Sequence, residues 1–576
     1  MPSRRRTPDA TKVVRHSSCG QLFPGTSPLA NHVSDNVWWS PSRNEPVIKS
    51  VLLRSELSRV PRREAVVPST LCRTRIVAFL LFFVGLALAH AQPSVSPATH
   101  NPSRPNLVLQ GDVRGSQNHT YVEVPFHVPP QVHRVTIRFA YTQKEQHTAL
   151  DLGLLDPVRL RCWSGGNKSG LTVALSDATP SCLPGEIPSG EWNVLIGVPN
   201  IRSGITSHYT IQVFFTRIDS VANEPDFLRE PLRTGPAWYR GDLHMHTAHS
   251  DGQCPSQTGK LVGCPVYFTV DAAARRGLDF IAITDHNATS QYDAMRELQS
   301  YFDKVLLIPG REITTFYAHL NFLGSAEYLD FRLGTPRVPT MNALIRDALR
   351  VGALVSINHP AAPSGEACMG CGWTPAEPVD MHLLSAIEAI NGGTNSVAFW
   401  EKQLTLGYRL TGIAGSDNHR GTRPLDQPQA IGRPTTVVYA SELSTPAILD
   451  GIRSGRVFID LTGSHDRLVD VSAQAAGAMA NMGGELNAPA AEDVTIHVHV
   501  DACPGATAAL IVDGQQPANA PAQTIDATNQ DLNFQWKSDG ARHWLLAEIR
   551  DAGARLLLLS NPVYVNWQQA HKPDQR

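Results

Sequence analysis

Short apolar runs alternate with segments of helical pattern between residues 240 and 463. The runs of strand length are 278–284, 305–308, 353–357, 386–390 and 411–414, and the helical segments lie around 270–276 and 341–351. An alternation of strands and helices builds a parallel sheet or a barrel. We therefore expect an α/β domain over residues 238–463.

The sequence on both sides of this region has the pattern of β structure. Residues 106–225 contain alternating runs such as 121–128 and 209–215, separated by turn-rich stretches, which is typical of a β-sandwich. Residues 466–568 alternate again, for example in 494–500. We expect a β domain on each side of the α/β region, with a role in packing or recognition.

An apolar run of 14 residues lies far from the N-terminus, at 76–89. Arg73 and Arg75 precede it and an Ala-His-Ala sequence follows, so we interpret residues 71–91 as a secretory signal peptide. The run is shorter than the roughly 20 residues that span a bilayer, which makes a membrane anchor the weaker alternative. Residues 1–70 are then a disordered leader or a start assigned too early, and 92–105 a linker. We expect a secreted or periplasmic protein without a stable membrane span.

The cysteines agree with export. Seven of the nine follow the apolar run, and their positions suggest three local pairs, 162–182, 254–264 and 368–371, with Cys503 left over. Such pairs are expected to form disulfides in an oxidising compartment. The alternative for Cys368 and Cys371 is half of a zinc site, which is weak because no second Cys-x-x-Cys sequence is present.

The charge distribution bears on the partner. The net charge is −2, and the basic excess lies in residues 1–75, so the rest of the chain is net acidic. General nucleic-acid binding is disfavoured because it depends on a basic patch. We expect a small-molecule substrate; the oligomeric state stays open.

Polar residues gather directly after the strand-like runs. His244 and His246 are separated by one residue at a strand end, so their side chains project to the same side, and Asp251 follows in the next loop. Further groups follow the later runs: Asp285-His286-Asn287, Glu312, His319, His359, and Asp417-Asn418-His419. A single histidine of this kind is more often structural than a ligand. Five clusters at the strand ends of one α/β region instead indicate a centre for two or three metal ions with N and O ligands.

These motifs carry a family resemblance. HMHTAHSDG, ITDHN, a Glu after Pro-Gly, an isolated His-Pro and SDNH together resemble the PHP (polymerase and histidinol phosphatase) family of metal-dependent hydrolases. GREITT and GSDNHRG are most similar to its carbaryl-hydrolase-like (CehA/McbA) branch. The resemblance covers roughly residues 238–463. It implies a distorted seven-stranded β/α barrel of the PHP type, here flanked by N-terminal and C-terminal β-sandwich-like domains.

The resemblance also implies an assignment of ligands. His244 and His246 would bind one metal together with Asp417. Glu312 would bridge that metal and a second one, which His319 and His359 complete. Asp251, His286 and His419 would form a third site. All nine motif positions are matched, and the ions would be zinc, manganese or iron, because the ligand set tolerates all three.

Around the ligands, four residues have open roles. Asp285 and Asn287 either orient His286 or cap the following helix. Arg420 and Arg311 either pair with an anionic group of the substrate or form structural salt bridges. His249 and His382 lie near the clusters but outside the pattern, and we expect neither to be a ligand.

The function hypotheses follow from the ligands. The first is a metal-dependent hydrolase that uses a metal-bridging hydroxide on phosphoester bonds of small substrates, with Glu312, Asp417 and Arg420 as catalytic residues. The second is a carbamate, ester or amide hydrolase of the carbaryl-hydrolase type. The third is a non-catalytic secreted binding protein with structural metals, which the nine-ligand open cluster disfavours because structural zinc sites normally have four ligands.

Overall fold

The structure is a computed structural model of the whole chain. It describes residues 104–567 except 165, 167, 218–227, 229 and 366–367. The chain divides into two units, residues 1–95 and 96–576, and all described residues belong to the second. The expected leader, the signal peptide and most of the linker therefore lie outside the described residues. No helix among the described residues combines the length and apolar character needed to cross a membrane.

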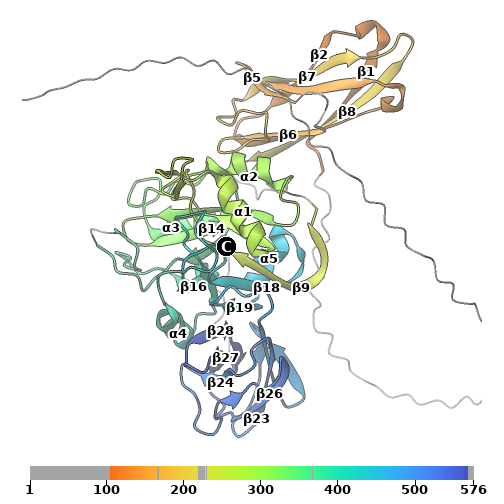
Figure 1. Cartoon of the computed structure of the whole chain (residues 1–576). Helices are drawn as coiled ribbons and strands as arrows, with labels where there is room; N and C mark the ends of the chain where they lie inside the picture. The colour runs from red at the N-terminus through yellow and green to blue at the C-terminus, as the bar shows by residue number, and fades with distance from the viewer. Residues whose placement is uncertain are drawn as a thin grey trace, which may run out of the picture. The chain divides into compact units, whose positions relative to one another are not determined.

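Two antiparallel sheets of four strands form the first described part of the chain (Figure 1). Both sheets contribute to one hydrophobic cluster that includes the buried side chains of Ile137, Leu152 and Trp192. A disulfide between Cys162 and Cys182 confirms one of the expected cysteine pairs. The strands, in sheet order, are β1 (Leu107–Arg114), β8 (Thr206–Arg217), β3 (Val132–Tyr141) and β6 (Gly170–Ala174), and β2 (Tyr121–Val128), β7 (Gly190–Asn200), β4 (Ala149–Leu155) and β5 (Leu160–Trp163).

Strands and helices alternate in the middle of the chain, as the sequence pattern predicts. The short strand β12 (Phe280–Ile283) is buried along its whole length, which explains its uninterrupted apolar sequence. Helix α1 (Val266–Arg276) ends at Gly277, whose φ of 72° is readily adopted only by glycine. The other elements are β9 (Arg233–Asp242), β10 (Gln253–Pro255), β11 (Leu261–Gly263), α2 (Gln291–Gln299), β13 (Leu306–Thr314), β14 (His319–Leu323), α3 (Met341–Arg350), β15 (Leu354–Ile357), β16 (Ala386–Asn391), α4 (Val397–Leu406), β17 (Thr411–Gly415), β18 (Thr435–Leu443), α5 (Thr445–Arg453) and β19 (Val457–Asp460).

The central strands follow one another in the order β9-β12-β13-β14-β15-β16-β17. Pairing is parallel except at β14, which is antiparallel to both β13 and β15. The reason is the short connection between Thr314 and His319, which returns the chain as a hairpin and leaves no room for a crossover helix. The fold is therefore mixed α/β, with many strands and few helices.

We find no closed barrel among the described strands. The edge of β9 that closure would require is taken by β18, which pairs with it antiparallel. Strand β17 meets β18 through the side chain of Thr436, whose hydroxyl accepts from Ala414 N (2.8 Å) and donates to Ala414 O (2.7 Å). Beyond the strand ends, a single bridge joins Met245 to Asn418. Next to this bridge, Asp417 N donates to His244 O and His246 N to Asn418 O, both at 2.9 Å. The ends of the strand order therefore approach each other, but the expected seven-stranded barrel is not confirmed.

The C-terminal strands continue the central sheet. β28 (Leu556–Ser560) pairs antiparallel with β19, and β27 (His543–Arg550) and β24 (Thr507–Val512) extend the order (Figure 1). A separate antiparallel sheet contains β21 (Ala478–Asn481), β20 (Leu468–Ala475), β23 (Asp493–Asp501) and β26 (Asn529–Lys537). Both sheets share one hydrophobic cluster. The remaining short strands are β22 (Glu485–Leu486), β25 (Gln523–Thr524) and β29 (Val563–Val565).

Candidate metal centre

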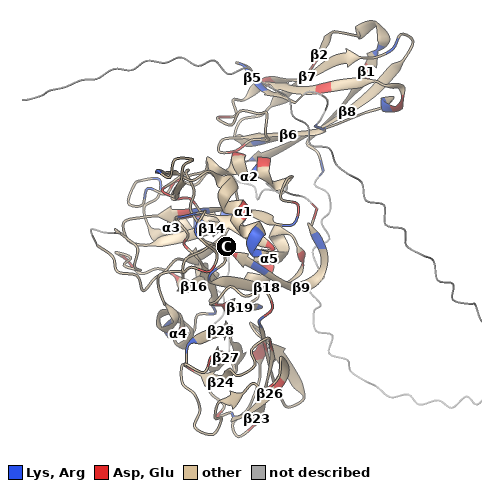
Figure 2. Cartoon of the chain, in the orientation of Figure 1, with Lys and Arg blue, Asp and Glu red and all other residues tan. Residues whose placement is uncertain are grey.

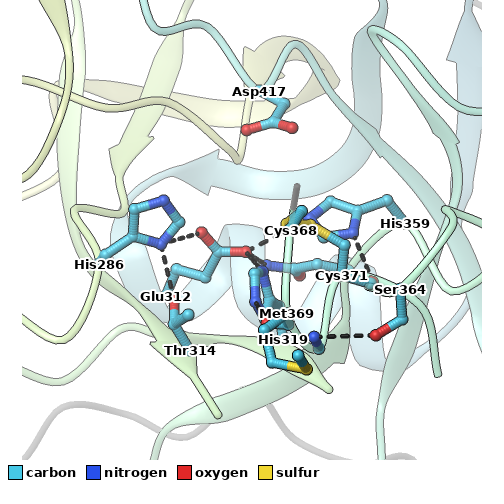
Figure 3. The surroundings of a disulfide bond; sticks show 12 residues. His286, Glu312, Thr314, His319, His359, Ser364, Cys368, Met369, Cys371 and Asp417 are labelled. Atoms are coloured by element: carbon cyan, nitrogen blue, oxygen red, sulfur yellow. Dashed lines mark hydrogen bonds and ion pairs between the residues drawn. A yellow bond between two sulfur atoms is a disulfide. The ribbon is translucent and has the colours of Figure 1, made fainter. Parts of the chain in front are cut away.

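Glu312 lies at the middle of the clustered side chains and is fully buried. Its Oε2 lies 3.3 Å from His244 Nε2, 3.5 Å from His246 Nε2 and 2.8 Å from His286 Nδ1. Its Oε1 lies 3.3 Å from His319 Nδ1 and 3.4 Å from His359 Nε2 (Figure 3). One carboxylate thus faces five imidazoles, with its two oxygens directed at different groups of histidines.

These residues come from the carboxyl ends of neighbouring central strands. His244 and His246 follow β9, His286 follows β12, His359 follows β15, and Asp417 and His419 follow β17. Two residues depart from the expected position after a strand. Glu312 lies within β13 and His319 begins β14, because these two strands form the hairpin described above.

Asp417 closes the cluster on the side of His244 and His246. Its Oδ1 lies 3.1 Å from His246 Nε2 and 3.4 Å from His244 Nε2. Asp417 has a φ of 51° and His359 a φ of 29°, conformations that cost a non-glycine residue free energy and that occur preferentially at functional sites. The strained backbone at two of the nine candidate ligands indicates that their placement matters more than local stability.

A third group of side chains is more open to solvent. Asp251 Oδ1 lies 3.4 Å from His419 Nε2 and 3.8 Å from His286 Nε2. The rings of His286 and His419 stack on the ring of His246 at centroid distances of 4.3 and 4.1 Å. Asp251 is 58% exposed, whereas His244 is fully buried. The structure therefore brings all nine predicted ligands together, five of them buried and four at least partly exposed.

The electrostatics of the centre are strongly coupled. Burial acts to raise the pKa of Glu312, but His244 and His286 hold that pKa well below its ordinary value. Burial acts to lower the pKa of His244, but Glu388, Glu312 and Asp417 raise it well above the ordinary value. The hydrogen bond and charge of Glu312 likewise overcome burial and raise the pKa of His359 to about 9. A ligand histidine has to be neutral, so a cation that bound here would replace these protons.

Two buried ring nitrogens support a fit to metal ions. His244 Nε2 and His319 Nδ1 form no well-aligned hydrogen bond, and each faces a Glu312 oxygen at 3.3 Å. Buried polar atoms normally form hydrogen bonds, so ring nitrogens that face one carboxylate in this way suit a cation between them. Ligand atoms of His244, His246 and Glu312 lie within 4.8 Å of one another, as do those of Glu312, His319 and His359, and those of His246, Asp251, His286 and His419. Imidazole and carboxylate in such groups suit divalent metal ions.

Glu388 is a part of the centre that the sequence analysis missed. This buried residue of β16 lies 2.8 Å from His244 Nδ1 through its Oε1, and its Oε2 accepts from His359 N (3.0 Å) and Asn391 Nδ2 (3.1 Å). A carboxylate on the far nitrogen fixes the orientation of a ligand imidazole and raises its basicity. The only signal in the sequence is one glutamate inside the otherwise apolar run AIEAI.

We expect Glu388→Gln to weaken metal binding by about tenfold or more, because glutamine removes the charge that supports His244. Competition with a chromophoric chelator measures the affinity. Glu401→Gln is the matched control, since Glu401 lies on α4 and belongs to none of the candidate ligand groups among the described residues. Equal affinity in the two variants would mean that Glu388 serves packing alone.

Asp285 and Asn287, which flank His286, form hydrogen bonds with other residues than expected. Asp285 accepts from Thr247 N (2.7 Å), Thr247 Oγ1 (2.7 Å) and Ser250 Oγ (2.6 Å), so it holds the loop that leads to Asp251. The side chain of Asn287 bonds to the backbone of Thr314. Neither residue caps α2, whose N-cap is Ser290. The Nδ1 of His286 instead lies 2.6 Å from Thr314 Oγ1.

The two candidate arginines differ. Arg311 is buried and donates to Leu329 O (2.8 Å), because it points to the opposite face of β13 from Glu312. Among the described residues it forms no salt bridge, and its direction does not favour contact with a substrate at the centre. Arg420 follows His419 and is exposed, and its side chain has no hydrogen bond or ion pair with any described residue. His249 (2.8 Å from Ser290 Oγ) and His382 (stacked on Tyr408) belong to none of the candidate ligand groups among the described residues.

The other cysteines give mixed results. Cys368 and Cys371 form a disulfide, as expected. The expected bond between Cys254 and Cys264 is wrong, because both are buried free thiols on the β10–β11 hairpin. Cys503 is also free, as expected.

Comparison with known proteins adds little. No model of a protein family matches this chain, and no curated protein matches it significantly. One similar solved structure is a "two-domain protein containing predicted PHP-like metal-dependent phosphoesterase" from Bacteroides vulgatus ATCC 8482, with 20% sequence identity and a TM-score of 0.33. The match covers 58% of this chain and 98% of that one. A similarity of this size carries no argument about function, which rests on the geometry of the site.

Proposed function

We propose that this chain is a metal-dependent hydrolase of the PHP type that binds two or three divalent ions, zinc, manganese or iron. The observation that carries the proposal is Glu312, a buried carboxylate whose two oxygens face two different groups of histidines. Such a carboxylate suits a bridge between two cations. The pair of ions would supply Lewis-acid chemistry, activating water as the nucleophile and neutralising charge that develops on the substrate.

The side chains of the chain itself hold and orient this centre. His244, His246 and Asp417 would hold one ion, and His319 and His359 a second, with Glu312 shared between them. Asp251, His286 and His419 would hold a third ion near solvent, where it could contact the substrate. Glu388 would keep the Nε2 of His244 directed at the centre.

Phosphoesters of small molecules are the substrate class that we propose first. Arg420 is an exposed cation beside His419 without a described partner, and a guanidinium matches the geometry of a phosphate group. In Figure 2 the basic and acidic residues are interspersed on the described ribbons, which is compatible with a small substrate. Secretion or export to the periplasm would fit a role in scavenging such molecules.

Carbamates, esters and amides are the second candidate class, and one feature favours them. Phe316 is 76% exposed, Met369 54% and Tyr317 39%, so the loops next to His319 carry exposed apolar side chains. The carbonyl oxygen of Met369 lies 3.4 Å from His319 Nε2, which places this rim beside the centre. Apolar groups at a site mouth suit an uncharged substrate with an aryl group.

Arg420→Ala separates the two classes. We expect the KM for a phosphoester to rise about tenfold or more, because one charge-assisted contact is lost, while the KM for a neutral carbamate stays the same. Steady-state kinetics of the two substrates measure this, and Arg420→Lys should give an intermediate loss. A phosphoester KM that is unchanged in the alanine variant would remove Arg420 from substrate binding.

The test of the function combines metal analysis with turnover. The full chain is analysed for bound metals and assayed with p-nitrophenyl phosphate, bis-p-nitrophenyl phosphate and a naphthyl carbamate. His382→Ala serves as a histidine control away from the centre. Two or three metals per chain with turnover of one substrate class is the expected result. One metal or none, without turnover after addition of Zn²⁺ or Mn²⁺, would favour a non-catalytic binding protein.

A further inference from the structure

The loop after His359 is closed by a disulfide that lies beside the candidate metal centre. Cys368 and Cys371 are bonded, and Gly365 and Cys368 exchange two backbone hydrogen bonds of 3.1 Å. The loop is tightly seated, since a Cβ on Gly370 would lie 2.2 Å from Thr315 O. Its position relative to the β13–β14 hairpin is therefore defined by close backbone contact.

Two carbonyl groups of this disulfide segment face two candidate ligands. The Cys371 carbonyl accepts from His359 Nδ1 (2.9 Å), and the Met369 carbonyl lies 3.4 Å from His319 Nε2 (Figure 3). The other nitrogen of each ring is directed at Glu312. A carbonyl on one nitrogen of an imidazole fixes the proton there and leaves the opposite nitrogen free to bind a cation. The disulfide loop is thus built to set the tautomers of His319 and His359.

The same geometry contains a second donor set. A ring nitrogen of His319 and the sulfur atoms of Cys368 and Cys371 lie within 4.8 Å of one another. In the disulfide the sulfurs cannot act as thiolate ligands. As a dithiol they would make, with the imidazole, a Cys₂His set of the kind that binds zinc.

We propose that Cys368, Cys371 and His319 form a redox-dependent site for a soft divalent cation, called here the thiol site. A dithiol reductant opens it: the S–S bond breaks, two S–H bonds form on the cysteines, and the reductant is oxidised to its own disulfide, so two electrons and two protons are transferred. The incoming cation then displaces the two thiol protons to solvent.

Filling the thiol site would act on the hydrolase centre, and this part of the inference rests on the proposed function. A neutral imidazole has one nitrogen that can bind a cation, because the other carries its proton. His319 engaged with the thiols is therefore withdrawn from the group that it forms with Glu312 and His359. The disulfide form would be the active one and the metal-loaded dithiol form the inactive one.

Cobalt provides a direct readout of the thiol site. The full chain is reduced with dithiothreitol, freed of it by gel filtration without air, and titrated with Co²⁺. We expect a sulfur-to-cobalt charge-transfer absorption and one additional bound cobalt per chain, compared with the oxidised protein. The reduced Cys371→Ser and Cys368→Ser variants should lack both, while keeping the wild-type circular dichroism. Because these variants retain the seven cysteines outside the loop, an absorption that persists in them at the wild-type intensity would overturn the proposal, as would its absence from the reduced wild type.

A second measurement tests the coupling to activity. One equivalent of Zn²⁺ added to the reduced wild type should lower turnover about tenfold, and reoxidation should restore it. The variant Cys162→Ser/Cys182→Ser, whose one remaining disulfide among the described residues is that of the loop, should respond like the wild type. Unchanged turnover with a filled thiol site would overturn the coupling. Absence of bound metal and turnover in the oxidised protein would instead contradict the proposed function, and the cobalt absorption would still decide on the thiol site.

Discussion

Glu312→Gln is expected to lose turnover by about a thousandfold or more and to retain fewer metal ions than the wild type. The amide has nearly the volume of the carboxylate, so packing is preserved. It carries no charge, however, and offers one acceptor atom where the carboxylate directs two oxygens at five imidazoles. Two cations could then no longer share this side chain.

Elemental analysis and initial rates on the same preparation measure both effects. Glu401→Gln is the matched control, as a half-buried glutamate on α4 that receives the same chemical change. A Glu312→Gln protein with full metal content and wild-type rates would exclude a shared carboxylate. Loss of turnover with full metal content would mean that Glu312 acts on the reaction without holding the ions.

Removal of the metals is expected to abolish turnover and to lower the melting temperature on the order of 10 °C. Chelation leaves His244 Nε2 and His319 Nδ1 buried without a well-aligned hydrogen bond, which is costly. Ligands that bind only the native state stabilise it by about 4 kcal/mol when their concentration is a thousandfold above Kd. Turnover and stability should therefore both return when Zn²⁺ or Mn²⁺ is added.

Scanning calorimetry with stepwise return of the metal measures this second effect. His382→Ala should follow the wild type in both states, because its imidazole stacks on Tyr408 outside the centre. A chelated protein that keeps its melting temperature and its turnover would contradict a metal centre in these residues. If stability is lost but turnover was never present, the metals would be structural.

The ligand candidates were accessible from sequence because their positions follow from simple periodicity. An apolar run predicts a strand, and the polar residue that ends it lies at the shared edge of the sheet. His244, His286 and Asp417 lie where this rule expects them. Glu312 departs from it, since its strand continues to Thr314 and returns as a hairpin. Four residues of connection are enough for that reversal, and their composition carried no clear turn signal.

Other parts depend on contacts that no local pattern encodes. Glu388 acts through a hydrogen bond to a residue 144 positions away, and the carbonyl groups that face His319 and His359 belong to no motif. The open strand order arises because β18, and not β17, pairs with the free edge of β9, and no local pattern predicts which of the two strands does so. Cys254 pairs with Val262 across the hairpin and Cys264 follows the end of β11, so proximity in sequence was not sufficient for a bond.

The pairing of β19 with β28 has a practical consequence for producing this protein. A fragment that stopped near residue 463 would lack β28, so one edge of β19 would have no hydrogen-bonded neighbour. The side chains of Val457, Phe458 and Ile459, which are buried in the whole chain, would then become more exposed to solvent. Such an edge is a template for copies of the same fragment to join, and aggregation would follow. The smallest piece worth expressing therefore runs on through Val565, because continuity of hydrogen-bonded strands, rather than the position of the last candidate ligand, sets where the molecule can be cut.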